Sequence, residues 1–367
     1  MNFEESKMQK ELKAKCNKEL EKWRFKILTI FAFLFVCGIN GLISRYVLAA
    51  EEINLYSSRH YDQDERLYSD FEKQTGIVIN RIEGDADELI QRIKNEGRNS
   101  PADILLTVDA GRLWRASSMG IFQPVHSNFL NSRIPVHLRH PDGLWYGFSQ
   151  RARIIFYDKS RVSPLQLQNY NALAEPSLKG MVCTRSSSNV YMLSLMSAQI
   201  EHAGRDGARN WAAGVYKNLA RSPQGSDTDQ LRAIASGQCG VTLANTYYFV
   251  RALRNEVDGI NKDNIAKIGW IFPNQDTTGA HINISGAGVI STAPNRKNAI
   301  KFMEYLASDS AQEYFSSDND EYPVVPGVGI SCALSKLGIF RQDIMNLSKL
   351  GEHQSLAQQL YDEVGYD

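Results

Sequence analysis

The chain has 367 residues, of which 43% are hydrophobic and 22% charged, and its formal net charge is zero. Such a chain forms one large or two ordinary globular domains. The charge is uneven, because residues 1–50 carry 9 Lys and Arg against 5 acidic residues, which leaves 32 basic and 36 acidic residues in the remainder. The mildly acidic body has no basic stripe, which argues against nucleic acid as a partner.

The first 50 residues have the pattern of a secretory leader. A Lys-rich stretch precedes the apolar run "ILTIFAFLFVCGI" at 27–39, and small residues follow near Ala49 and Ala50, where a signal peptidase would cut. The apolar run is shorter than the ~20 residues that span a membrane. We therefore predict export to the periplasm and cleavage of the leader, with a membrane anchor as the alternative if the leader is retained.

An alternating pattern begins directly after the leader. The apolar periodicity predicts three strands and two intervening helices, at 53–58, 64–76, 77–84, 86–97 and 101–109. The order β-α-β-α-β is typical of a parallel sheet covered by helices, and such sheets place ligands beyond the carboxyl ends of their strands.

A second alternating stretch follows. A strand-rich segment is predicted at 145–159, and two segments at 179–200 and 234–254 each have the order strand, polar turn, helix. An apolar run with glycines at 281–295 and a helix at 296–308 precede a Pro- and Gly-rich stretch at 322–329. Two α/β units with a returning chain predict two lobes, joined by segments that cross near 147–153 and 280–287, with a ligand cleft between them.

Export gives the cysteines of the body a possible structural role. Cys183 and Cys239 are candidates for a disulfide in an oxidising compartment, and two small buried residues are the alternative. Bridging them would close a loop of some 55 residues, worth about 4 kcal/mol by the chain-entropy argument. Cys332 would be left over.

Five side chains share one predicted environment, the carboxyl end of a strand and the amino end of a helix. They are His60, Tyr61, Tyr191, Tyr247 and Tyr248. A free phenol has a pKa near ~10, but a highly charged cation can deprotonate its ligand outright. Ferric ion is hard and trivalent and prefers anionic oxygen, so this set predicts a ferric site.

The predicted ferric site would carry an excess negative charge that nearby cationic side chains must offset. Four phenolates and a neutral imidazole around a trivalent ion sum to −1, and three arginines are candidates to offset it: Arg59, Arg153 and Arg185. Each residue also has an ordinary interpretation: a histidine at a helix start as a cap, a tyrosine as a packing residue, the "RSSSN" turn as an anion site. His137 and His140 have a metal-like spacing but are expected on the surface, in a Pro- and Arg-rich loop.

Several stretches resemble one known family. They include "INLYSSRHY", "RSSSNVY", "LANTYYF" and "HINISGAGV", and the likeness spans residues 53–367. The chain resembles the periplasmic ferric-ion-binding proteins of bacterial ABC uptake systems, especially the cyanobacterial iron-deficiency-induced subgroup. This resemblance implies an α/β, two-lobed type II periplasmic binding protein fold with a hinge and an interlobe cleft. The lobes would comprise 51–148 with 284–322, and 149–283 with 323–367, after the leader at 1–50.

The resemblance also implies a function. His60 and Tyr61 would coordinate Fe3+ from the first lobe, and Tyr191, Tyr247 and Tyr248 from the second. A water or a synergistic anion could fill a sixth position. The partners would be an inner-membrane ABC permease and its ATPase, and the protein would be a monomer with no enzymatic activity. The alternative is a binding protein of the same fold for a small organic or anionic solute.

One residue departs from the family pattern. Members of the family often carry lysine where Gln150 stands, which leaves the charge balance of the iron site open.

Overall fold

The computed structural model describes residues 51–59, 61, 63–254 and 256–366. The predicted leader and His60 lie outside the described residues, so the expectations for them remain predictions. Glu52–Asp367 form one unit by their internal contacts. Within the described part of the chain, no helix is both long and apolar enough to cross a membrane.

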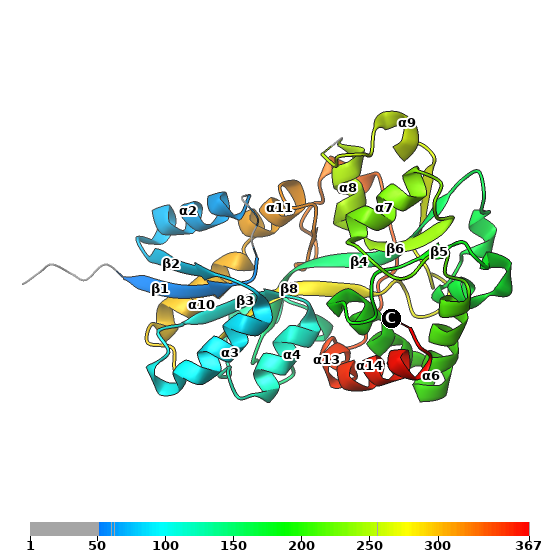
Figure 1. Cartoon of the computed structure of the whole chain (residues 1–367). Helices are drawn as coiled ribbons and strands as arrows, with labels where there is room; N and C mark the ends of the chain where they lie inside the picture. The colour runs from blue at the N-terminus through cyan, green and yellow to red at the C-terminus, as the bar shows by residue number, and fades with distance from the viewer. Residues whose placement is uncertain (1–50, 60, 62, 255, 367) are drawn as a thin grey trace, which may run out of the picture. The chain divides into compact units, whose positions relative to one another are not determined.

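The first five predicted elements are confirmed to within three residues. They are β1 (Glu52–Ser57), α2 (Asp64–Thr75), β2 (Val78–Glu83), α3 (Ala86–Glu96) and β3 (Ile104–Val108). Strand β1 pairs in parallel with both β2 and β3, and α2 and α3 cover opposite faces of these strands (Figure 1). Gly76 ends α2 because its φ of 73° is in the left-handed region that glycine tolerates.

The sheet is mixed rather than parallel throughout. Its strand order is β2-β1-β3-β8-β4-β6-β5, and the short strands β7 (Ile268–Ile271) and β9 (Tyr322–Pro323) pair with β4. Strand β8 (Ile282–Val289) is antiparallel to both β3 and β4. Strand β4 (Tyr146–Asp158) is buried along its whole length, pairing with β8 through Ala152 and with β6 from Arg153 onward. The two long strands therefore connect the halves of the fold near the predicted crossing segments (Figure 1).

The second half contains the two predicted pairs of strand and helix, β5 (Val182–Cys183) with α6 (Val190–Lys217) and β6 (Val241–Asn245) with α8 (Thr246–Leu253). Helices α7 (Asp227–Ala235) and α9 (Lys262–Ile265) were not predicted. Helix α6 is kinked at Gly204, whose φ is 71°. Cys183 and Cys239 form a disulfide with their Cα atoms 5.9 Å apart, which matches the predicted pairing, and Cys332 is free and exposed.

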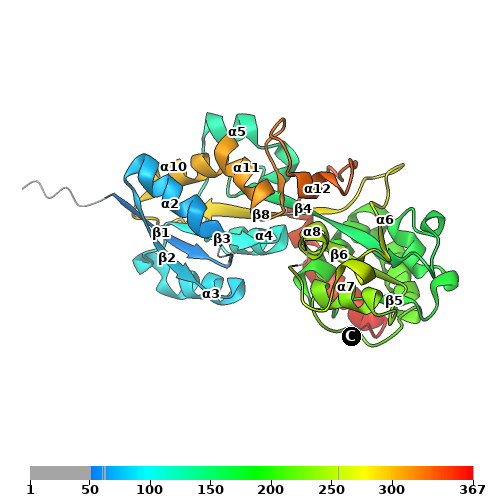
Figure 2. The same ribbon diagram turned by 90° about the horizontal axis from the view of Figure 1, so that it is seen from above.

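Several helices were not anticipated. Besides the predicted α10 (Arg296–Leu306), the chain forms α4 (Ala110–Ser118), α5 (Asn128–Arg133), α11 (Asp309–Ser317), α12 (Cys332–Ser335), α13 (Ser348–Glu352) and α14 (Gln354–Glu363). Short 3-10 turns lie at Gly97–Asn99, Val136–Leu138, Pro164–Gln166, Tyr170–Ala174 and Pro176–Leu178. Helix α13 packs against both α4 and α6, and Figure 2 shows α4 and α6 in different halves. Helix α14 adds Leu360 and Tyr361 to the core around Met192 and Trp211.

Candidate metal centre

Four tyrosines from both halves of the fold form one cluster. Tyr61 lies in the loop between β1 and α2, Tyr191 in the first turn of α6, and Tyr247 and Tyr248 in the first turn of α8. The hydroxyl oxygens of Tyr191 and Tyr247 are 3.4 Å apart, and the ring centroids of Tyr247 and Tyr248 are 4.3 Å apart. Tyr61 is close enough to interact electrostatically with Tyr191 and Tyr247.

Strand ends and helix starts position three of these side chains as predicted. Asn189 caps α6, since its Oδ1 accepts the Tyr191 N–H at 3.1 Å. Strand β6 runs directly into α8 through Asn245, an extended residue that occupies the N-cap position without a side-chain cap bond. Tyr61 precedes α2 by three residues rather than opening it.

Burial raises the pKa values of three of these phenols and so favours their neutral form in the absence of a cation. It raises the pKa of Tyr61 to about 12, and the charge of Glu321 adds to this effect. The pKa of Tyr247 is raised well above its usual value, first by burial and then by Tyr191, Tyr248 and Tyr61. Burial, with Tyr191 and Asp227, also raises the pKa of Tyr248. Because each ionised phenol opposes the ionisation of the next, the cluster can become anionic only beside a strong positive charge.

The first predicted arginine, Arg59, lies against Tyr61. Its guanidinium carbon is 4.8 Å from the centroid of the Tyr61 ring. The same guanidinium forms buried ion pairs with Asp64 and Glu321, each at 2.9 Å. Its charge is thus shared between the phenol and two carboxylates.

The other two predicted arginines lie beside Tyr191 and share a carboxylate. Arg153 and Arg185 are 5.8 Å and 5.4 Å from the Tyr191 ring centroid. Both pair with the fully buried Asp227, at 3.0 Å from Arg153 and 3.7 Å from Arg185. Arg153 therefore forms its main ion pair with Asp227, a residue that was not predicted to be near the site.

Two arginines that were not predicted also flank the phenols. Arg151, 1% exposed on β4, is 5.8 Å from the Tyr191 ring centroid, and its Nε and Nη2 have no hydrogen-bond partner among the described residues. Arg251 of α8 lies between the halves, 5.3 Å from the Tyr61 ring and 5.2 Å from the Tyr247 ring. Both guanidiniums can attract phenolates by charge and neutral rings by cation–π interaction.

A buried carboxylate completes the surroundings of the cluster. Glu321 accepts hydrogen bonds from Arg59 at 2.9 Å and from the Ser149 hydroxyl at 2.7 Å. Burial opposes its ionisation, but Arg59, Arg151 and the Ser149 bond outweigh burial and lower its pKa, so Glu321 is anionic. Five guanidiniums and the four carboxylates of Asp64, Asp109, Asp227 and Glu321 thus leave one positive charge near the four phenols.

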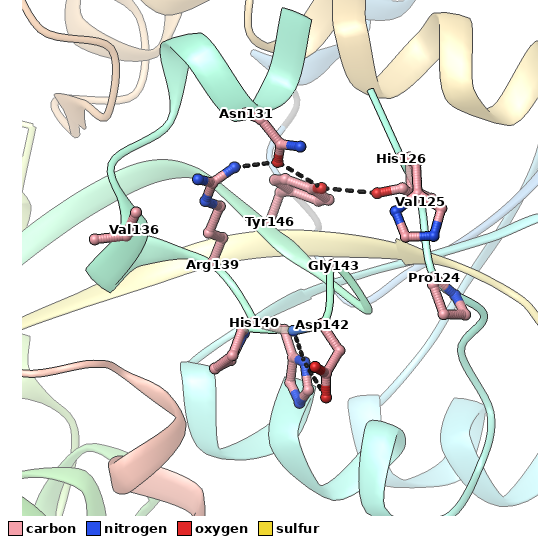
Figure 3. A pocket seen from close by; sticks show the side chains of 11 residues that line it. Pro124, Val125, His126, Asn131, Val136, Arg139, His140, Asp142, Gly143 and Tyr146 are labelled. Carbon is pink, nitrogen blue, oxygen red and sulfur yellow. Dashed lines mark hydrogen bonds and ion pairs between the residues drawn. The ribbon is translucent and has the colours of Figure 1, made fainter. Parts of the chain in front are cut away.

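A separate hollow of about 530 Å³ lies beside the start of β4. Figure 3 shows its groups engaged with one another: the Tyr146 hydroxyl donates to the Val125 carbonyl at 2.9 Å, and Arg139 bonds to Asn131. His140 lines this hollow and, like His137, is half-buried rather than on the open surface as expected. Among the described residues, no three His, Cys, Asp or Glu side chains are grouped to hold a metal.

The architecture and the cluster define a class of protein. Two α/β halves are linked by the long strands β4 and β8, and side chains of metal-ligand type come from both halves. This is the two-lobed type II periplasmic binding protein fold, in which lobes close on a solute about a hinge.

Comparisons with known proteins agree with this class. Residues 66–335 match the bacterial extracellular solute-binding protein family, and the chain belongs to that family. Iron uptake protein A2 of Synechocystis sp. is 51% identical over 330 residues, which cover 89% of this chain and 94% of that protein. Iron uptake protein A1 of the same organism is 49% identical over 316 residues, which cover 86% and 88%. The solved structure of Trichodesmium IdiA (FutA) in complex with iron and citrate superposes with a TM-score of 0.83 at 50% identity, covering 86% of this chain and all of that one.

Proposed function

We propose that this chain is an exported binding protein that captures ferric iron between its lobes and delivers it to an ABC transporter. The observation that carries this proposal is the convergence of four phenols, with Tyr61 from the first half and Tyr191, Tyr247 and Tyr248 from the second. The names of the relatives, two iron uptake proteins and an iron-bound structure, support the same ion.

The four tyrosines would bind the ion as phenolates, and His60 would donate one nitrogen. Phenolate suits a hard trivalent cation better than the thiolates or thioethers that softer ions prefer. A water or an anion would take any remaining position, and the citrate in the Trichodesmium complex is a precedent for an anion.

The arginines would offset the negative charge of the iron site, a role that the neutral side chain of Gln150 does not fill. Four phenolates and a trivalent ion sum to −1, and the surroundings carry one positive charge in excess. The Gln150 amide instead donates to the Pro323 carbonyl at 2.7 Å, and along a strand its side chain points to the face opposite Arg151.

Capture would proceed by closure of the lobes about β4 and β8. We assign 51–148 with 284–322 to the first lobe and 149–283 with 323–367 to the second. The packing of α14 in the core around Trp211 supports the second assignment. The contact of Arg251 with both Tyr61 and Tyr247 supports a site that is complete only when the lobes are closed.

The remaining parts of the proposal follow from the family and the leader. The protein would act in the periplasm as a monomer, or at the membrane if the leader is retained, and would pass iron to an inner-membrane permease driven by an ATPase. It would have no catalytic activity, since a binding protein needs only a difference in affinity between open and closed states.

A visible spectrum of purified residues 51–367 tests this function. Adding chelated ferric iron should produce a phenolate-to-iron charge-transfer band that saturates at one ion per chain. A protein that stays colourless at saturating iron would contradict the proposal. A melting shift with a small organic or anionic solute would then support the alternative ligand class.

Iron binding is expected to strengthen as the pH rises. The pKa values of Tyr61, Tyr247 and Tyr248 are raised, so these phenols are protonated in the unloaded site and must lose their protons on binding. Each released proton adds up to about tenfold in affinity per pH unit. Competition with a chelator of known pH dependence, between about pH 6 and 8, measures the slope. A pH-independent affinity would exclude phenolate ligands.

A further inference from the structure

Asp109 connects three parts of the fold through one buried carboxylate. It follows β3 and caps α4, accepting the Gly111 N–H at 2.8 Å. It also accepts the side-chain amide of Asn283 on β8 at 2.8 Å. The hydroxyl of Ser194 on α6 lies 2.8 Å from both of its oxygens. Asp109 and Ser194 are fully buried, so this contact is shielded from water.

The backbone of Asp109 is held in a conformation that few residues tolerate. Its φ is 81° and its ψ 123°, in the left-handed half of the map that favours glycine. Such strain persists only where surrounding contacts fix the residue, and it is concentrated at functional sites. Here the fixing contacts come from α4, the hinge strand β8 and α6.

The contact with Ser194 links the first half to the helix that carries a candidate ligand. Ser194 follows Tyr191 by three residues in α6, so both side chains lie on the same face of the helix. Asp109 also interacts electrostatically with Arg151, which in turn interacts with Tyr191 and Tyr247. The carboxylate is therefore linked to the tyrosine cluster through Arg151, and its side-chain hydrogen bonds among the described residues go to Gly111, Ser194 and Asn283 rather than to the phenols.

We propose that Asp109 is a positioning residue that fastens the Tyr191 end of α6 to the first lobe in the closed state, and that its bond to Ser194 slows iron release. This inference rests on the proposed function. The lobes must separate for the ion to leave, and separation breaks a hydrogen bond between a fully buried hydroxyl and a fully buried carboxyl group. A hydrogen bond that is shielded from water opposes this separation.

The test compares two serines of the same helix. Ser194→Ala removes the bond to Asp109, whereas Ser197→Ala removes a hydroxyl that donates only within α6, to the Leu193 carbonyl at 2.9 Å. Both serines are fully buried, so the two variants lose the same atom in similar surroundings. We expect iron release to a competing chelator to be about tenfold faster in Ser194→Ala and within about twofold of the unmodified protein in Ser197→Ala.

Two further readouts separate positioning from a general structural role. The wavelength of the charge-transfer band should be unchanged in both variants, because all the ligands remain. Small-angle scattering of the iron-free protein should show a larger radius of gyration only for Ser194→Ala, because the bond to Asp109 no longer favours the closed state.

Asp109→Asn provides a second route to the same contact. Asparagine tolerates positive φ but replaces one acceptor oxygen with a donor, so it should also accelerate release. Equal release rates in the two alanine variants would overturn the inference. Absence of the band in the unmodified protein would overturn the proposed function, and with it this inference, and is a distinct result.

Discussion

Tyr247→Phe is expected to abolish most ferric binding while leaving the fold intact. The ring of Tyr247 is 2% exposed and packs against the Tyr248 ring at a tilt, and phenylalanine can keep this packing. The lost hydroxyl, 3.4 Å from that of Tyr191, would be a metal ligand. Outer-shell partners of a metal contribute about 10–100-fold in affinity, so loss of a direct ligand should exceed about a hundredfold. Chelator competition measures the affinity, and the intensity of the charge-transfer band should fall in parallel.

A tyrosine outside the cluster provides the control. Tyr305 of α10 donates its hydroxyl to the Leu67 carbonyl at 3.1 Å, within the first half. Tyr305→Phe should leave iron affinity unchanged and lower the free energy of unfolding by about 1 kcal/mol at most. The iron-free Tyr247→Phe protein should also unfold within about 1 kcal/mol of the unmodified protein. A large loss of stability with normal affinity would instead make Tyr247 a packing residue.

Local patterns carried most of the fold prediction. The first five elements and the helix starts at Tyr191 and Tyr247 depend on periodicity and capping within short windows of sequence. The tyrosines could be grouped because strand ends and helix starts share one edge of an α/β sheet. The helices α11, α13 and α14 were missed because their placement depends on packing between distant segments, as in the contacts of α13 with α4 and α6.

The electrostatic surroundings of the site were only partly predictable. Arg153 was predicted to offset the negative charge of the site. Whether its charge is available for this role depends on which carboxylate it pairs with. That carboxylate belongs to Asp227, which is 74 residues away in sequence. The strand pattern contained a usable signal for Arg151. Within the buried strand β4, polar side chains at Ser149, Arg151 and Arg153 alternate onto one face, the face that also meets Glu321 and Asp227.

Variants of Arg151 and Arg153 can be compared to test which of the two guanidinium charges supports iron binding. Both are buried on the same face of β4, two residues apart. Arg153 pairs with Asp227 at 3.0 Å and leaves its Nε without a hydrogen-bond partner, whereas both Nε and Nη2 of Arg151 have no hydrogen-bond partner in the described part of the chain. Arg153→Met should leave a buried carboxylate poorly compensated and destabilise the protein by about 3 kcal/mol.

Arg151→Met is expected to weaken iron binding without destabilising the iron-free protein. Glu321 keeps Arg59, and Asp109 keeps its three donors, so no carboxylate is stranded. An apolar side chain in place of an underpaired guanidinium should leave the iron-free stability unchanged or raise it. Arg151 lowers the otherwise raised pKa of Tyr247, so its loss makes ionisation of that phenol harder.

Ferric affinity near pH 7 should therefore fall about 10–100-fold in Arg151→Met, and the affinity should recover as the pH is raised. Arg151→Lys keeps the charge and should retain most of the affinity. Thermal unfolding of the iron-free proteins and chelator competition at two pH values measure these effects. Equal affinity in Arg151→Met and the unmodified protein would mean that Arg59, Arg185 and Arg251 suffice to offset the phenolates, and that the underpaired Arg151 guanidinium serves another purpose.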